Sequence, residues 1–234
     1  MLASAGVNTR SGTAPAHGRD STLRLALWLG LVGILIALAY ASHTSSSDPQ
    51  VLYKWSTAVG VLIQDAILLG LVLAIAGGRY ELLAWRRPVA LAQTGWTLLA
   101  ALVGVYVFEI AYSSIAHPGN EQGLTPSHWE PQHAAAYVVN AIVICTWVPI
   151  VEETTYRGLG FSLLSRFGRW PAILVVGLLF GLSHGLLVSL PILVFFGCVV
   201  AWVRSITRSV FPGMILHGSF NLIALLVAVS VHRS

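Results

Sequence analysis

Two adjacent carboxylates and a guanidinium, Glu152, Glu153 and Arg157, lie at the end of a long apolar segment. An ionisable side chain at the middle of a bilayer costs about 2.5–3.5 kcal/mol, so such residues usually serve a function. In a helix, Glu153 and Arg157 can form an ion pair one turn apart, while Glu152 points about 100° away. Glu152 is then left free for chemistry, although the three residues could also serve only to join helices.

Two more groups of polar residues lie in apolar segments further along the chain. The sequence has eight histidines, and only His184 and His217 fall in segments apolar enough to enter a membrane. A helix would place His217 and Asn221 on one face, because they are four residues apart. Glu152 and His184 are each 14 residues from the loop between their segments, which is about 21 Å along a helix. They can therefore lie at the same depth.

These residue types suit the hydrolysis of a peptide bond. A buried glutamate whose proton is shared with an imidazole can act as a general base near neutral pH, so Glu152 and His184 could activate a water molecule. The developing oxyanion needs hydrogen-bond donors, and His217 and Asn221 supply two of them. An amide does not titrate, which makes Asn221 a donor rather than a proton relay. We predict that these groups line a polar cavity that is open to the cytoplasm.

Three motifs carry a resemblance to a known family. They are Glu152-Glu153-x-x-x-Arg157, Phe180-x-x-x-His184 and His217-x-x-x-Asn221. In this order they resemble the motifs of the CPBP family of CAAX prenyl endopeptidases and bacteriocin-processing proteases, also called the Abi family, and all three match without departure. They cover about residues 145–225, whereas the N-terminal half has no motif that we can assign.

The resemblance implies an intramembrane glutamic protease in which Glu152, assisted by His184, activates the hydrolytic water. It also implies that His217 and Asn221 form the oxyanion site, and that the supporting residues are Glu153, Arg157 and Phe180. Substrates in the eukaryotic branch of the family are prenylated C-terminal Cys-aliphatic-aliphatic-x tails. Many bacterial relatives act on other membrane peptides, or serve in bacteriocin immunity or protein sorting.

Two alternatives remain open. A zinc-dependent peptidase could use Glu152, His184 and His217 as ligands and keep a site for water. The His-Glu-x-x-His signature of many zinc peptidases is absent, however, and one histidine per helix fits a site without metal better. The other alternative is a non-catalytic immunity or transport protein whose buried polar groups bind a ligand or relay protons. We therefore predict a hydrolase that needs no cofactor, with zinc as the alternative.

The elements that position these residues must lie in a membrane. Of the 234 residues, 56% are hydrophobic and only 9% are charged, and the mean hydropathy is +0.77. We predict an all-α, polytopic transmembrane helix bundle of about seven spans, within a range of six to eight. The apolar segments are 25–41, 51–77, 90–116, 134–164, 171–187, 190–207 and 213–231. In the fifth, glycines at 177, 181 and 185 predict the close approach of a neighbouring helix.

The positive residues predict the orientation, because cytoplasmic loops hold the excess of Lys and Arg. With the N terminus inside and the C terminus outside, ten of the 13 basic residues are cytoplasmic: Arg10, Arg19, Arg24, Arg79, Arg86, Arg87, Arg166, Arg169, Arg204 and Arg208. Lys54 and Arg233 fall outside. These positions account for the net charge of +4, so the predicted partners are the lipid bilayer and a membrane-associated protein or peptide, prenylated or not, and no nucleic acid. We place the chain in a bacterial cytoplasmic (inner) membrane.

We divide the chain into a disordered cytoplasmic tail at 1–22, N-terminal transmembrane helices at 23–133 and CPBP-like catalytic helices at 134–231. Ala39-Tyr40-Ala41 resembles a signal-peptidase site, and cleavage there would remove the first helix. Both cysteines, Cys145 and Cys198, lie in apolar segments and are predicted to be core residues.

The other polar residues are predicted to be structural. We expect Asp65, Glu109 and Asn140 to form hydrogen bonds with neighbouring helices. Trp85 is expected to anchor the chain at the membrane interface. The histidines of the longer outer loop are expected to be exposed; they are His117, His128 and His133.

Overall fold

The computed structural model describes residues 16–42, 50–118, 121, 126 and 129–231. All regular elements in these ranges are helical, which confirms the all-α prediction. The α-helices are α1 (Ala16–Ala41), α2 (Trp55–Ala76), α3 (Leu91–Ala116), α4 (Ala134–Ile142), α5 (Val148–Glu153), α6 (Phe161–Leu164), α7 (Arg169–Leu182), α8 (Leu190–Thr207) and α9 (Phe211–Val231). Short 3₁₀ helices are η1 (Val51–Tyr53), η2 (Tyr80–Leu83), η3 (Pro131–His133) and η6 (Ser165–Phe167).

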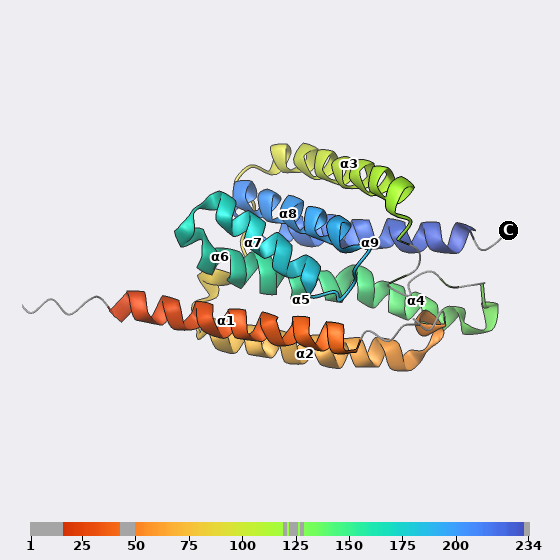
Figure 1. Cartoon of the computed structure of the whole chain (residues 1–234), viewed down its shortest axis with the longest axis horizontal. Coiled ribbons are helices and arrows are strands. Elements are labelled where there is room, and N and C mark those ends of the chain that lie inside the picture. Colours follow the sequence, from red (N-terminus) through yellow and green to blue (C-terminus); the bar gives the residue numbers. More distant parts are fainter. Residues whose placement is uncertain (1–15, 43–49, 119–120, 122–125, 127–128, 232–234) are drawn as a thin grey trace, which may run out of the picture.

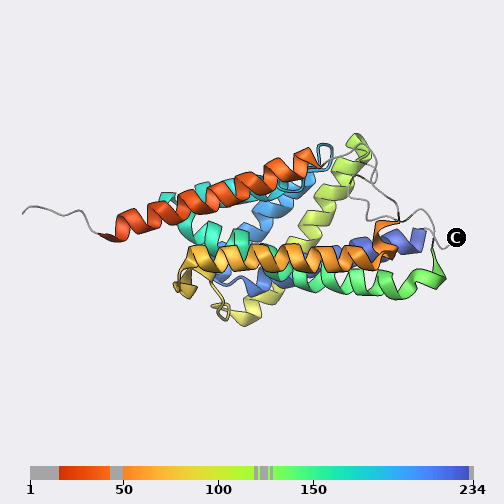
Figure 2. The ribbon, with the colours of Figure 1, turned by 90° about the horizontal axis from the view of Figure 1, so that it is seen from below.

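One continuous helical segment, Pro131–Phe167, runs through the middle of the bundle between the α1–α2 pair and the helices α8 and α9 (Figure 1). Two stretches of it have π geometry: η4 (Val143–Trp147) and η5 (Thr154–Gly160), which enclose α5. Figure 2 shows that α3 is tilted strongly against α2. π segments inside α-helices occur often at functional sites, and here they flank the Glu152-Glu153 pair.

Six helical segments in the described residues are long and apolar enough to cross a membrane. They are Asp20–Ala41, Trp55–Ala76, Gln93–Ala116, Pro131–Phe167, Leu190–Thr207 and Phe211–Ser230. Their outer surfaces carry large apolar side chains such as Ile110 and Ile115, which are mostly exposed in the isolated chain. Lipid would cover these side chains, so the chain is an integral membrane protein.

The fifth predicted span, 171–187, is shorter than expected. The apolar helix α7 ends at Leu182, and its 14 residues extend about 21 Å, less than the roughly 30 Å hydrocarbon core. It stops there because Gly185 takes a left-handed conformation (φ 67°), which glycine adopts at little cost. As a result, His184 lies just beyond the helix, in the connection to α8.

The packing of α7 against α8 confirms that the glycines of α7 permit a close approach. A Cβ atom on Gly177 would collide with the sulfur and backbone of Cys198, and one on Gly181 would collide with Val194. The third glycine, Gly185, instead packs against the backbone of Ala39 at the end of α1. The two helices are therefore held at a separation that larger side chains would not allow.

The N-terminal region differs from the predicted tail at 1–22, because α1 already begins at Ala16. Asp20 explains the extra helix: its carboxylate pairs with Arg24 one turn later (3.2 Å) and with Arg79 after α2 (2.7 Å). Residues 1–15 lie outside the described part of the chain. Further along α1, the fully buried Trp28 donates a hydrogen bond to the Thr155 carbonyl (3.0 Å), so α1 packs directly against η5.

The arginines gather at one end of the bundle, the left end in Figure 1. Arg24 donates to the Ile75 carbonyl, Arg86 to the Arg208 carbonyl (2.7 Å) and Arg169 to the Ser205 hydroxyl (3.0 Å). We refer to this end, where α2 ends, α6 leads into α7 and α8 leads into α9, as the arginine end. α1 and α3 end, and α2 and α4 begin, toward the opposite end (Figure 1).

The expectations for the isolated polar residues are met only in part. Asn140 does bond to another element, donating to the Leu52 and Lys54 carbonyls at 3.0 Å each. In contrast, Oδ2 of Asp65 and Oε2 of Glu109 are buried without a hydrogen-bond partner among the described residues. The prediction of bonded acids was therefore wrong for these two oxygens.

Three further expectations concern side chains near the ends of helices. Trp85 is partly exposed, as an interfacial anchor should be, but its indole also donates to the Thr154 hydroxyl (3.0 Å) and so supports η5. His117 and His133 are exposed, as predicted, and His133 pairs with Glu130 (2.6 Å). His128 lies outside the described residues.

Candidate active site

Glu153 is the centre of a fully buried ionic network. Its Oε1 accepts hydrogen bonds from Nη1 of Arg157 (2.9 Å) and from Nδ1 of His217 (3.1 Å). The other Arg157 terminal nitrogen donates to the Gly197 carbonyl (3.0 Å), and the guanidinium stacks on the Phe180 ring at 4.3 Å. The predicted ion pair between Glu153 and Arg157 is therefore confirmed. The pair joins η5, α7, α8 and α9.

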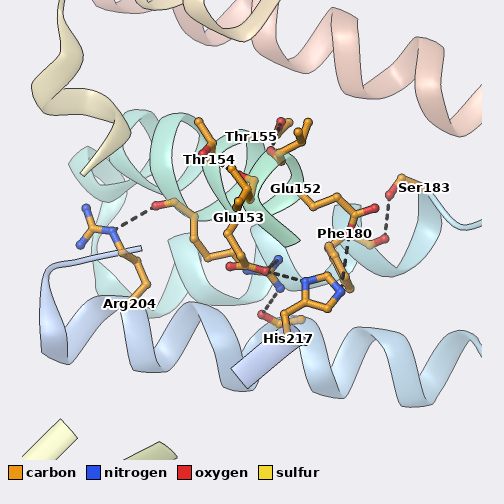
Figure 3. Close-up of polar contacts among 12 residues, drawn as sticks. Glu152, Glu153, Thr154, Thr155, Phe180, Ser183, Arg204 and His217 are labelled. Atoms are coloured by element: carbon orange, nitrogen blue, oxygen red, sulfur yellow. Dashed lines mark hydrogen bonds and ion pairs between the residues drawn. The ribbon is translucent and has the colours of Figure 1, made fainter. Parts of the chain in front are cut away.

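Glu152 leaves the same helix on a different side (Figure 3). Its side chain keeps 22% exposure, whereas that of Glu153 keeps none. Oε2 of Glu152 lies 3.8 Å from Nε2 of His217 and has no hydrogen-bond partner among the described residues. A carboxylate oxygen without a donor is costly unless water or substrate binds it. Oε2 of Glu153 also lacks a partner in the described part of the chain, but of the two only Glu152 keeps exposure and lines the cavity. Glu152 is thus the carboxylate of this pair that is open to a ligand.

His184 is held by its own helix end. Its Nδ1 lies 2.8 Å from the Phe180 carbonyl, and a carbonyl can only accept a hydrogen bond, so Nδ1 carries the proton. Nε2 is the ring nitrogen that this bond leaves available. The Phe180 ring lies between the two histidines, with centroids 4.7 Å from His184 and 5.8 Å from His217. Phe180 therefore fixes the position of both imidazoles.

Asn221 is anchored to the helix that carries the glutamates. One of its amide hydrogens goes to the Ile144 carbonyl (2.9 Å) in η4, which leaves a second N–H for another acceptor. α9 can come this close because residue 218 is glycine; a Cβ atom there would collide with the Cys145 carbonyl. The π geometry of η4 and this glycine thus bring Asn221 to the same region as Glu152.

A cavity of about 530 Å³ joins these residues. Of the seven residues proposed from the sequence, Glu152, Phe180, His184, His217 and Asn221 line it, while Glu153 and Arg157 lie behind it. The cavity is mainly apolar elsewhere, with Phe196 and Phe220 among its walls. The structure therefore separates the residues that can touch a ligand from those that support them.

The alternative zinc ligands do not fit a metal centre. No group of three or more His, Cys, Asp or Glu side chains in the described residues is arranged to hold a metal ion. Nδ1 of His217 is bonded to Glu153 and Nδ1 of His184 to a carbonyl, so each histidine could offer only Nε2 to a metal. The cavity residues are thus arranged around an open space for a substrate or water rather than around a common metal position.

Comparison with known families agrees with this geometry. Residues 134–223 match the family described as Rce1-like type II CAAX prenyl endopeptidases. These residues form a domain of that family. The family implies a hydrolase, an intramembrane peptidase, and all the residues that we proposed lie within the matched range. Comparisons with curated proteins and with solved structures give no match.

The cavity of the Rce1-like domain runs from Glu152 toward the end of the bundle opposite the arginine end. Its lining includes Ala39 near the end of α1, Ser42 after α1, Leu52 in η1, Thr57 in α2 and Glu121 after α3. None of the arginines in the described residues lines it. We predicted both an inside N terminus and a cavity open to the cytoplasm, and these two predictions exclude each other. The error arose because helix lengths fix depth but not the side on which the space between helices opens.

Sequence reasoning missed several residues that build the site of the Rce1-like domain. Glu121 accepts hydrogen bonds from the Val188 and Ser189 amides (3.1 and 2.7 Å) and from the Ser189 hydroxyl (2.7 Å), so it ties the chain after α3 to the α7–α8 connection. Phe196 stacks near His217 at 5.1 Å. Both lie outside the motifs, and no spacing in the sequence connects them with Glu152.

Proposed function

We propose that the chain is an intramembrane endopeptidase that hydrolyses a peptide bond of a membrane-associated protein or peptide. Glu152, with His184, takes a proton from water, and the resulting hydroxide attacks the carbonyl carbon. His217 and Asn221 donate hydrogen bonds to the oxyanion. When the carbon–nitrogen bond breaks, the proton passes to the leaving amine. Glu153, Arg157 and Phe180 hold His217 and the helix in place.

The observation that carries this proposal is the contrast between two adjacent glutamates. Glu153 has no exposure, pairs with Arg157 and does not line the cavity, while Glu152 keeps 22% exposure and lines the cavity 3.8 Å from an imidazole. With His217 protonated, Glu152, Glu153, Arg157 and His217 carry no net charge together. An imidazolium that donates through Nδ1 to Glu153 can donate through Nε2 to an oxyanion, as the proposed role of His217 requires.

The wider features of the proposal follow the sequence. We propose seven crossings: the six long spans, and α7 together with the connection that follows it, with the N terminus inside and the C terminus outside a bacterial cytoplasmic membrane. Residues 134–231 are the catalytic helices, and residues 23–133 are the preceding membrane helices that complete the bundle. The substrate is a CAAX-type tail, a sorting segment or a bacteriocin-related peptide.

The test is cleavage of membrane peptides by the purified chain and in cells that make it. Glu152→Gln keeps the shape of the side chain but cannot accept the proton, so cleavage should fall by about 10²–10⁴-fold or more while expression and insertion are unchanged. Glu109→Gln is the matched control, because it removes another carboxyl with an unpartnered oxygen that does not line the cavity. Full biological function of the Glu152→Gln chain would instead favour a binding or immunity role.

A further inference from the structure

The cavity has a direction, and this direction decides how a substrate reaches it. It begins at Glu152, Phe180 and His217 in the middle of the bundle and continues to residues at three helix ends: Ser42 after α1, Leu52 in η1 and Glu121 after α3. Ser42 is exposed. All three lie at the end of the bundle opposite the arginine end, where α2 begins and α3 ends (Figure 1).

The charges at the two ends are very unequal. The arginine end holds eight arginines with described side chains: Arg24, Arg79, Arg86, Arg87, Arg166, Arg169, Arg204 and Arg208. At the opposite end, Lys54 is the one Lys or Arg in the described residues, beside the acids Glu121 and Glu130. Basic residues near the ends of membrane helices are retained in the cytoplasm. The arginine end is thus the cytoplasmic end, and the cavity leads away from it.

We infer that the active-site cavity opens on the non-cytoplasmic side of the membrane and accepts an apolar, uncharged or basic polypeptide segment that is presented there. The inference rests on the proposed peptidase function and specifies its substrate. Among the three proposed substrates, it favours a sorting segment or a bacteriocin-related peptide that has reached the outer side. A prenylated tail at the cytoplasmic surface would instead meet the arginine end. The described residues that line the cavity do not extend to that end.

The chemistry of the cavity wall specifies the segment further. Its walls are mostly apolar, its carboxylates are Glu121 and Glu152, and no Lys or Arg in the described part of the chain lines it. An acidic substrate residue would meet like charges without a cationic partner, and burying such a charge unpaired is costly. A volume of about 530 Å³ is within the range of cavities that enclose ligands of a few residues. A short extended stretch of apolar or basic residues therefore suits it.

The orientation can be tested with a matched pair of serines. Ser42 at the cavity mouth and Ser165 at the arginine end are both exposed, and each hydroxyl donates to the carbonyl three residues earlier, at 3.2 and 2.9 Å. Ser42→Cys and Ser165→Cys are made in a chain in which Cys145 and Cys198 are replaced by Ala. Each variant is treated in intact bacterial spheroplasts, and after lysis, with a maleimide that does not cross membranes.

We expect Ser42→Cys to be labelled in intact spheroplasts and Ser165→Cys only after lysis. The opposite pattern, or labelling of both from one side, would overturn the inference. A bulky maleimide on Ser42→Cys should also reduce cleavage of a membrane peptide at least tenfold, whereas the same group on Ser165→Cys should leave cleavage unchanged. Unchanged cleavage after modification at Ser42 would contradict the proposal that the substrate enters the cavity there.

The two proposals fail in different ways. Labelling with the maleimide reports orientation whether or not the chain cleaves anything. If the unmodified protein has no peptidase activity but Ser42→Cys is labelled from outside, the proposed function fails and the direction of the cavity stands. If the protein cleaves peptides but Ser165→Cys is labelled from outside, the function stands and the inferred side of entry is wrong.

Discussion

The buried side and the cavity side of the site are built in opposite ways from similar residues. On the buried side, Glu153, Arg157 and His217 are joined by bonds of 2.9–3.1 Å, although Oε2 of Glu153 and Nε of Arg157 have no partner among the described residues. On the cavity side, Glu152 has an oxygen without a partner, and His184 and Asn221 are each fixed by one hydrogen bond to a backbone carbonyl. The two sides start from adjacent glutamates. Position on the helix, not residue type, therefore decides which carboxylate is buried and which lines the cavity.

This difference shows how a membrane protein can keep an unpaired carboxylate in its interior. Burying charges costs several kcal/mol per ion, and only good geometry with further hydrogen bonds offsets the cost. The buried side meets that condition, since Arg157 bridges Glu153, the Gly197 carbonyl and the Phe180 ring. The cavity side does not, so its stability depends on the scaffold that the buried side provides. The two sides should consequently respond differently to substitution.

The largest effect is expected on the buried side. Arg157→Met leaves Glu153 buried without its cationic partner, which should lower the free energy of unfolding by about 3–5 kcal/mol. Thermal unfolding in detergent would measure the loss. The double variant Glu153→Gln with Arg157→Met should recover part of it, because no charge is then left unpaired. If Arg157→Met unfolds at the wild-type temperature, the buried side does not have the structural role that we assign to it.

A smaller effect, on activity alone, is expected on the cavity side. His184→Gln removes an imidazole that does not hold the fold together, so kcat should fall about 10²-fold or more without a change in unfolding temperature. The matched control is His133→Gln, an exposed histidine far along the chain that should leave kcat unchanged. A His184→Gln chain that loses stability as much as activity would show that both sides of the site are structural.

The sequence predicted the parts of this comparison that depend on helical spacing. The Glu153–Arg157 pair follows from a separation of one turn, and the hydrogen-bonded Asn140 follows from the cost of a buried amide. The glycines of α7 predicted its close packing against α8, because small residues let two helices approach closely. Motif spacing also brought Glu152, His184, His217 and Asn221 to one cavity, although His184 lies just beyond the end of α7 rather than on a helix.

The rest depends on contacts that no local pattern encodes. The π segments η4 and η5 lie on either side of α5, which carries the two glutamates, and no spacing in the sequence indicates them. The end of α7 before His184 depends on how Gly185 meets α1. The side on which the cavity opens is a property of the spaces between helices. Hydropathy and spacing describe single helices, so they could not supply it.

The smallest effect is expected at Glu121, which supports the cavity side of the site from outside the membrane. Burial raises the pKa of Glu121, but the hydrogen bonds from Ser189 and from the neighbouring backbone amides outweigh it and lower the pKa overall. A lowered pKa in the folded state means that the carboxylate stabilises the fold fully above its ordinary pKa and loses this contribution as the pH falls through the lowered value.

Glu121→Gln should cost about 1 kcal/mol or less at neutral pH, because solvent partly screens the contact. Thermal unfolding at several pH values should show the difference from wild type shrinking as the pH falls, with Ser189→Ala giving a smaller change of the same sign. A difference that grows in acid would show that Glu121 does not hold the α7–α8 connection as a carboxylate.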